Sequence, residues 1–148
     1  GDGALAAYDA GARAGDADAQ NELGYRYRRG RGVAKDFDTV ARWLEAAAVQ
    51  GHVGASNRLA WLLATCPSPS VCDGERALGL AHYVVEADDS PGHLDTLAAA
   101  YARVGDYARA EATVNQVLER LQSGTSRYAR YADRLRLYSN AEPYRLRD

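Results

Sequence analysis

Residues 16–52 read DADAQNELGYRYRRGRGVAKDFDTVARWLEAAAVQGH and contain two helical patterns joined by a glycine-rich turn. In the first pattern, Leu23, Gly24 and Tyr27 fall at positions i, i+1 and i+4, so they share one face of a helix. The small Gly24 allows a neighbouring helix to approach closely, and the two large side chains fill the space beside it. The stretch therefore predicts two helices that pack against each other.

The first of these patterns returns at nearly regular intervals along the chain. Leu59 follows Leu23 by 36 residues, Leu97 follows Leu59 by 38, and Tyr131 follows Leu97 by 34. A glycine or alanine comes directly after each of the four. Repeats of this length that alternate between two helical patterns are typical of stacked helix pairs.

A second helical pattern alternates with the first, since residues 4–15 match residues 40–51 at an offset of 36. We expect its helices to begin at aspartates, whose carboxylates accept hydrogen bonds from free backbone N–H groups. These aspartates are Asp36, Asp73 and Asp106. Helices are expected to end at glycines. These glycines are Gly51, Gly105 and Gly124.

These signals predict one all-α domain that covers residues 1–148, with three to four stacked antiparallel helix pairs. The expected helices are residues 3–14, 17–29, 36–50, 53–65, 73–87, 92–104, 106–122 and 125–139. The expected units are about 16–52, 53–90 and 91–124, with a partial unit at each end. From Asn140 onwards we expect a short tail that Pro143 interrupts.

Composition limits the classes of function. The chain has 148 residues, of which 47% are hydrophobic and 26% charged, as in an ordinary globular domain. No apolar run approaches the roughly 20 residues of a membrane span, so we expect no membrane insertion. The net charge of −2 argues against a dedicated nucleic-acid-binding protein. Residues 124–148 hold six Arg against three acids, or +3, which leaves −5 for residues 1–123. That excess predicts either a surface that steers a partner or a solvated helix face.

The opening stretch, taken as a whole, resembles a Sel1-like repeat. The matching residues are Ala19, Leu23, Gly24 and Tyr27 in the first helix, Gly30, Gly32, Val33, Lys35 and Asp36 in the turn, and Trp43, Ala47, Ala48 and Gly51 in the second helix. Val40 departs from the alanine that is usual there. Residues 95–121 resemble a tetratricopeptide unit through Leu97, Ala98, Tyr101, Gly105, Asp106, Tyr107 and Ala110, without its closing proline. The unit between them is a hybrid with an elongated turn.

The resemblance covers about residues 4–138 and implies a right-handed α-solenoid. Members of these families mostly scaffold protein complexes, often in bacterial envelopes, and are not enzymes. We therefore expect a non-catalytic scaffold that binds a protein or peptide and needs no cofactor. The alternative is an enzyme or a small-ligand-binding protein that uses the same concave surface. Exposed terminal helices could also support self-association.

The resemblance further implies which residues bind the partner, because the first helix of each pair lines the concave surface. The positions that do not pack internally are Asn21, Tyr25, Arg28, Asn57, Trp61, Thr65, Asp95, Ala99 and Arg103. Tyr25 and Trp61 place aromatic rings in successive units, beside asparagines that can pair with an extended peptide backbone. The alternative is that these two rings pack against the next helix.

Cys66 and Cys72 bracket Pro-Ser-Pro-Ser-Val in the elongated turn. The ends of such a turn between antiparallel helices can approach to the about 4.4–6.8 Å between Cα atoms that a disulfide requires. The alternatives are two separate thiols or a metal site, but a tetrahedral metal site needs about four ligands. We predict a disulfide, which would favour the periplasm or the cell exterior.

Other candidate chemistry has simpler explanations. We expect structural roles for the three histidines, which are His52, His82 and His93, and neither catalytic residues nor metal ligands. The arginines near the first turn, Arg26, Arg28, Arg29 and Arg31, could contact nucleic acid together with tyrosine. They are expected to spread over different helix faces, and the chain is acidic. These arginines therefore favour an anionic peptide over nucleic acid.

Overall fold

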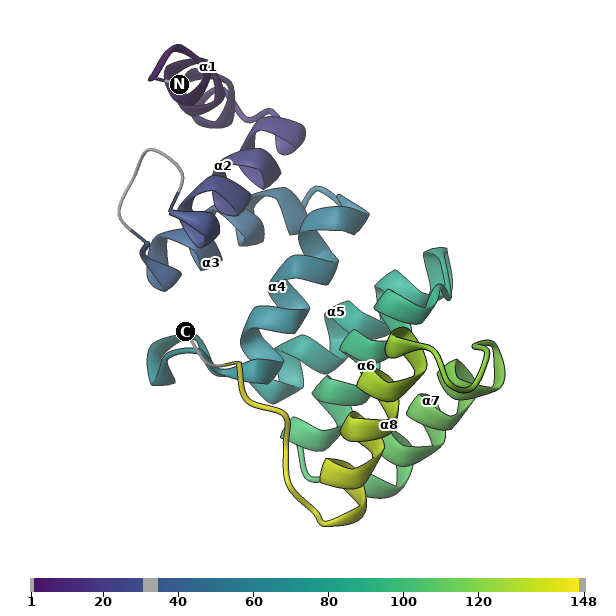
Figure 1. Ribbon diagram of the computed structural model, residues 1–148. Coiled ribbons are helices and arrows are strands. Elements are labelled where there is room, and N and C mark those ends of the chain that lie inside the picture. Colours follow the sequence, from purple (N-terminus) through teal and green to yellow (C-terminus); the bar gives the residue numbers. More distant parts are fainter. Residues whose placement is uncertain (1, 31–34, 147–148) are drawn as a thin grey trace.

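The computed structural model describes residues 2–30 and 35–146. In this part of the chain it has eight α-helices, one short 3₁₀ helix and no strand (Figure 1). The elements are α1 (Asp2–Arg13), α2 (Ala17–Arg29), α3 (Phe37–Ala48), α4 (Val53–Thr65), η1 (Pro69–Val71), α5 (Gly74–Ala87), α6 (Pro91–Arg103), α7 (Tyr107–Glu119) and α8 (Ser126–Ser139). Every predicted α-helix is present, and η1 is an addition inside the elongated turn.

Each α-helix packs against the one that follows it in the chain (Figure 1). In addition, α4 packs directly against α6, so the first helices of two successive pairs lie side by side. The all-helical prediction and the packing of consecutive helices are confirmed. No described helix combines the length and the apolar composition needed to cross a lipid bilayer.

The helix boundaries follow the capping residues of the sequence. Asp36, Asp73 and Asp106 are the N-caps of α3, α5 and α7, and each carboxylate accepts hydrogen bonds from backbone N–H groups of the first turn. His52 caps α4 in the same way, because its Nδ1 accepts from the N–H of Ala55 at 3.0 Å. Its Nε2 lies 2.8 Å from the carboxylate of Asp18 on α2, which fixes the ring. The cap thereby also links two first helices.

Small residues set the spacing between helices, as the sequence predicted. A Cβ atom at Gly24 would lie 2.8 Å from Cδ2 of Leu44, so α2 and α3 approach too closely for a larger residue without a shift. Ala60 and Ala98, the equivalent residues of the next two units, are completely buried. Ala60 lies in a core formed by apolar side chains of α3 to α6, and Ala98 lies in a second core formed by α6, α7 and α8.

A disulfide joins Cys66 and Cys72, as predicted, with their Cα atoms 4.6 Å apart. It connects the end of α4 to the beginning of α5 and encloses η1. A backbone hydrogen bond from the N–H of Asp73 to the carbonyl of Leu63 supports the same turn at 3.0 Å. The C-terminal end of α4 is therefore held firmly against α5.

Residues 141–146, called the C-terminal segment below, run back from α8 across the ends of α4 and α6 (Figure 1). The N–H of Leu146 donates to the carbonyl of Thr65 at 2.9 Å. The guanidinium of Arg103 donates to the carbonyl of Tyr144 at 3.3 Å. From the sequence we expected only a short tail, and its return to α4 is an additional finding.

Candidate partner-binding groove

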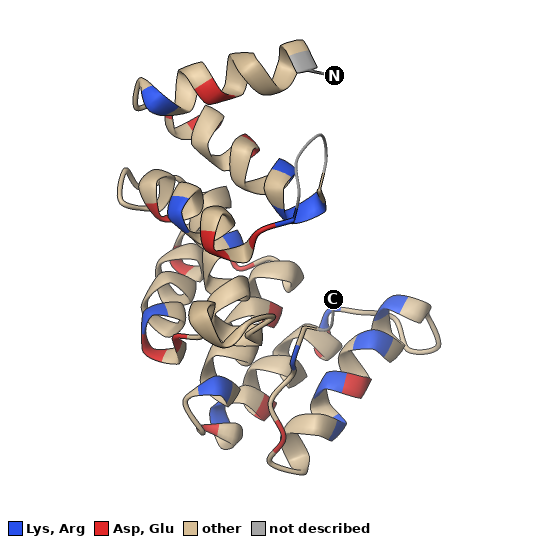
Figure 2. Ribbon diagram, turned by 90° about the vertical axis from the view of Figure 1, so that its left-hand side faces the viewer, with Lys and Arg blue, Asp and Glu red and all other residues tan. Residues whose placement is uncertain are grey.

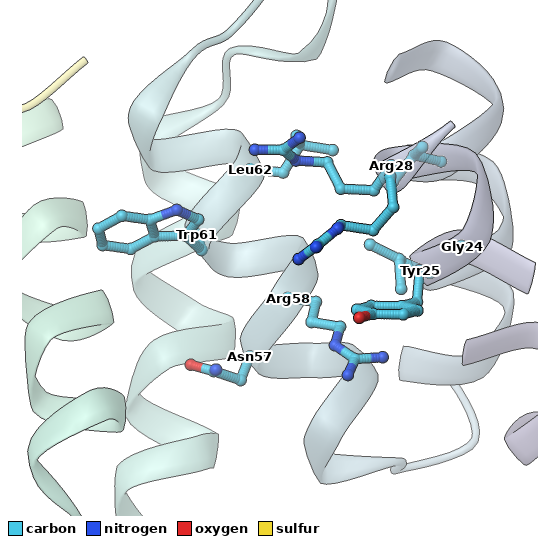
Figure 3. A pocket seen from close by; sticks show the side chains of 10 residues that line it. Gly24, Tyr25, Arg28, Asn57, Arg58, Trp61 and Leu62 are labelled. Atoms are coloured by element: carbon cyan, nitrogen blue, oxygen red, sulfur yellow. The ribbon is translucent and has the colours of Figure 1, made fainter. Parts of the chain in front are cut away.

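A cleft of about 260 Å³ lies between α2 and α4, and we call it the α2–α4 cleft (Figure 3). Side chains of α2, α3 and α4 line it. They are Gly24, Tyr25, Arg28, Arg29, Val40, Leu44, Asn57, Arg58, Trp61 and Leu62. Whereas α4 and α6 pack directly, α2 and α4 leave this space open between them.

The α2–α4 cleft contains four of the residues predicted to bind a partner, namely Tyr25, Arg28, Asn57 and Trp61. Asn21, a fifth, is next to it, because its Oδ1 accepts a hydrogen bond from Arg58 Nη1 at 3.1 Å. The structure thus brings together five of the nine positions assigned to partner binding. Whether a partner contacts them stays a prediction.

Arginine and tyrosine determine the electrostatics of this cleft. The guanidinium of Arg58 lies 4.8 Å from the centre of the Tyr25 ring, and that of Arg29 lies 5.7 Å from it. Both distances are typical of cation–π contacts, which fix the orientation of the guanidinium groups. Among the ten lining residues, three are arginines and none is acidic.

Asn57 and Trp61 are one turn apart on α4 and project from the same side of the helix (Figure 3). They point away from Tyr25, toward the later helices of the chain. The Oδ1 atom of Asn57 is buried and has no hydrogen-bond partner in the described part of the chain. A buried amide oxygen without a donor is uncommon in proteins, which makes this wall of the cleft polar and unsatisfied.

The surface where α4 and α6 meet has the opposite character, because α8 and the C-terminal segment cover it. Arg134 of α8 binds the carboxylate of Asp95 with two hydrogen bonds, of 3.1 and 3.2 Å. The same guanidinium stacks 3.9 Å from the centre of the Tyr144 ring and 5.4 Å from that of Trp61. We call this the closed half of the groove.

The remaining residues of the sequence prediction lie in the closed half. Thr65 is completely buried, and its hydroxyl donates to the carbonyl of Trp61 at 2.7 Å. Asp95 is buried against Arg134, and Ala99 is also buried. Arg103 donates to the carbonyl of Ala64 at 2.7 Å. For these positions the interpretation as groove surface needs correction, because α8 and the C-terminal segment occupy the space in front of them.

Burial changes the acid–base behaviour of the closed half. It raises the pKa of Asp95 above its usual range, and the positive charge of Arg134 opposes this increase. Burial also lowers the pKa of Arg103, and the nearby charge of Arg145 adds to the effect. The closed half therefore carries a cost of desolvation that its internal ion pair offsets in part.

The sequence prediction did not include three side chains that line the cleft or cover the closed half: Arg58, Arg134 and Tyr144. The predicted contacts on α4 are four residues apart, at Asn57, Trp61 and Thr65, and Arg58 falls between these positions. Arg134 belongs to the basic excess of residues 124–148, which was interpreted as a solvated face or a steering surface. Figure 2 shows that excess along α8, with further basic residues at the end of α2. The basic excess of residues 124–148 was a signal for charged interactions of α8. It did not indicate that Arg134 pairs with the buried Asp95.

The histidines have structural contacts. Besides the cap formed by His52, the ring of His93 is 2.7 Å from the carbonyl of Asp88, and that of His82 is 3.3 Å from the Tyr101 hydroxyl. In the described part of the chain, no three side chains of His, Cys, Asp or Glu lie together as a metal site would require. We find no matching model of a known protein family and no significant similarity to a curated protein sequence.

Proposed function

We propose that this chain is a non-catalytic interaction module that binds an extended segment of a partner protein along the groove formed by α2, α4 and α6. In this proposal the chain is a right-handed α-solenoid of the Sel1-like and tetratricopeptide class. The resemblance of residues 16–52 and 95–121 supports the class. The succession of packed helices supports the solenoid.

One observation supports the proposal: the chain holds an extended segment of its own against the C-terminal ends of α4 and α6. The C-terminal segment is held by a backbone hydrogen bond to Thr65 and by the guanidinium of Arg103. It also inserts Tyr144, whose ring centre is 5.4 Å from that of Trp61. Main-chain hydrogen bonds combined with an aromatic anchor are a common way for a protein to hold a peptide.

The α2–α4 cleft supplies the part of the groove that the C-terminal segment does not cover. It has an aromatic ring at each side, Tyr25 and Trp61, and hydrogen-bonding side chains between them. The disulfide at the end of α4 fits an oxidising compartment, such as the periplasm or the cell exterior. In such a compartment the disulfide would hold the C-terminal end of α4, and with it one end of the groove, in a fixed position.

The test compares partner capture by the wild type and by a Tyr25→Ala/Trp61→Ala variant. Proteins retained from an extract of the source cells are identified by mass spectrometry, and each candidate is purified for titration against both forms. We expect the double variant to bind a true partner at least about tenfold more weakly, because buried aromatic anchors dominate such interfaces.

A Val49→Ala/Tyr83→Ala variant is the matched control, since both side chains are large, hydrophobic and exposed, 70% and 43% accessible, and neither lines the α2–α4 cleft. Circular dichroism establishes that all forms remain folded. Equal affinity of the purified partner for the folded wild type and the folded groove variant would contradict the proposal.

A further inference from the structure

We propose that the α2–α4 cleft is a subsite for an acidic side chain of the bound segment, with Arg29 and Arg58 as the residues that hold its carboxylate. This inference rests on the proposed function, because it specifies the chemistry of the segment that the groove binds. It commits to one occupant: a Glu or Asp side chain of an extended partner peptide.

The closed half of the groove provides an internal model of such a subsite. There, Arg134 stacks on aromatic rings while its Nε and Nη2 atoms bind both oxygens of Asp95. Stacking leaves the edge of a planar guanidinium free for a bidentate carboxylate, which is the strong form of this hydrogen bond. In the closed half, the arginine that lies over the aromatic rings therefore pairs with a carboxylate.

The α2–α4 cleft repeats the first part of that arrangement. Arg58 and Arg29 both stack on Tyr25, as Arg134 stacks on Tyr144 and Trp61. Arg58 donates one hydrogen bond to the side-chain oxygen of Asn21, out of the five N–H groups that a guanidinium has. Over residues 3–30 and 35–146, no carboxylate is within ion-pair distance of Arg29 or Arg58. In the proposal, an acidic side chain of the bound segment supplies the carboxylate that Asp95 supplies in the closed half.

The walls of the cleft strengthen the attraction for an anion. Val40 and Leu44 of α3 and Leu62 of α4 contribute an apolar lining beside the arginines. An ion pair against such a surface is less screened by water than one on an open face. The arginines of α2 spread over different faces, as the sequence pattern predicts, because Arg26 lies over the Tyr8 ring and Arg28 over the Phe37 ring. Arg28 and Arg29 nevertheless both line the cleft.

The same geometry favours a peptide over a nucleic acid. A single-stranded nucleic acid needs open aromatic faces on which its bases can stack. The guanidinium of Arg58 already covers the ring of Tyr25 at 4.8 Å. Trp61 is in contact with both Tyr144 and Arg134. The cleft thus offers donors for a single carboxylate, without a platform for bases.

The experiment measures binding of short fluorescein-labelled peptides to the full chain by fluorescence anisotropy at low salt. One peptide alternates Glu and Ser, and the second carries Gln in place of Glu. We expect the Glu peptide to bind at least about tenfold more tightly than the Gln peptide, because hydrogen bonds to charged groups are the stronger ones. We also expect an Arg29→Gln/Arg58→Gln variant to lose that preference.

An Arg13→Gln/Arg136→Gln variant changes the net charge equally at exposed positions outside the cleft, where these side chains are 70% and 73% accessible. It should retain the affinity of the wild type within about twofold. Arg58→Lys keeps the charge but loses the planar donor fork, so it should fall between wild type and the double variant.

Four results would overturn the inference. The first is an equal loss of affinity in the two double variants, and the second is absence of Glu-peptide binding up to about 1 mM. The third is binding of a short oligothymidine that depends on Arg29 and Arg58 and is tighter than binding of the Glu peptide. Equal, Trp61-dependent binding of the Glu and Gln peptides would also reject the acidic subsite. That last result would leave the proposed function standing, so the two failures can be distinguished.

Discussion

The two halves of the groove share one feature, an arginine that lies over an aromatic ring, and they differ in whether that arginine has a carboxylate partner. In each, an arginine stacks on aromatic side chains: Arg58 on Tyr25 in the α2–α4 cleft, and Arg134 on Tyr144 and Trp61 in the closed half. In the closed half the chain itself supplies the carboxylate of Asp95. In the α2–α4 cleft, no described residue does so for Arg58.

This difference separates the contributions of the two arginines. A stacked arginine whose partner belongs to the same chain contributes to folding, because its loss leaves a buried charge behind. An equally stacked arginine at the surface of an open cleft contributes little to folding, and its hydrogen-bonding capacity remains for another molecule. The comparison therefore predicts that replacing the arginine by alanine lowers the free energy of unfolding strongly in the closed half and hardly at all in the α2–α4 cleft.

Arg134→Ala is the variant with the largest expected effect on stability. It leaves the carboxylate of Asp95 buried without its partner, with both side chains of the pair only 11–12% exposed in the wild type. We expect the free energy of unfolding to fall by about 3 kcal/mol. Arg58→Ala is the matched control and should cost about 0.5 kcal/mol or less. Urea denaturation followed by circular dichroism measures both.

An Asp95→Asn/Arg134→Gln variant sharpens the same test. It removes both charges together, so it should be more stable than Arg134→Ala alone. If Arg58→Ala and Arg134→Ala destabilised the chain equally, the distinction between the two halves would be wrong.

Loss of the disulfide is expected to have the next largest effect. Replacing Cys66 and Cys72 by serine frees the end of α4, the helix that belongs to both halves of the groove. The closed loop is short, so we expect a decrease of about 2 kcal/mol in the free energy of unfolding. Urea denaturation with and without a thiol reductant tests this. The serine variant, as control, should be insensitive to the reductant, and an unchanged wild-type midpoint after complete reduction would refute the prediction.

The smallest expected effect is a dependence on pH that only the closed half produces. Burial raises the pKa of Asp95 in the folded chain. The protonated Asp95 therefore stabilises the folded state, and this stabilisation is complete at pH values below the pKa that Asp95 has in the unfolded chain. This contribution declines as the pH rises through the folded-state pKa. The free energy of unfolding of the wild type, relative to Asp95→Asn, should therefore decrease from about pH 4 upwards. Urea denaturation over a pH series gives this difference, and an increase with pH would show the sign to be wrong.

The helices were predictable because their signals are local. Asp36, Asp73 and Asp106 mark the starts of three helices by capping backbone groups within one turn. The same holds for the disulfide, whose two cysteines are separated by only 6 positions. Repeat spacing also placed Tyr25 and Trp61 beside one cleft.

The covering of the closed half was not predictable in this way. Asp95 and Arg134 are 39 residues apart and come from different units, so no turn or helical period relates them. The path of the C-terminal segment depends equally on tertiary contacts, such as the bond from Leu146 to the carbonyl of Thr65. Sequence reasoning therefore named several residues that line the α2–α4 cleft, but it did not predict which part of the surface the chain itself covers.

In the proposed function, the C-terminal segment competes with a partner for part of the groove. Because the segment is tethered, its effective local concentration is of the order of millimolar, whatever the concentration of the protein. A partner that contacts the ring of Trp61 from the side of Tyr144 has to displace the C-terminal segment. The apparent affinity of that partner is reduced in proportion to the fraction of molecules in which the segment has left the groove. A partner confined to the α2–α4 cleft meets no such competition from residues 141–146. Selection among partners can thus begin with how far along α4 each of them reaches.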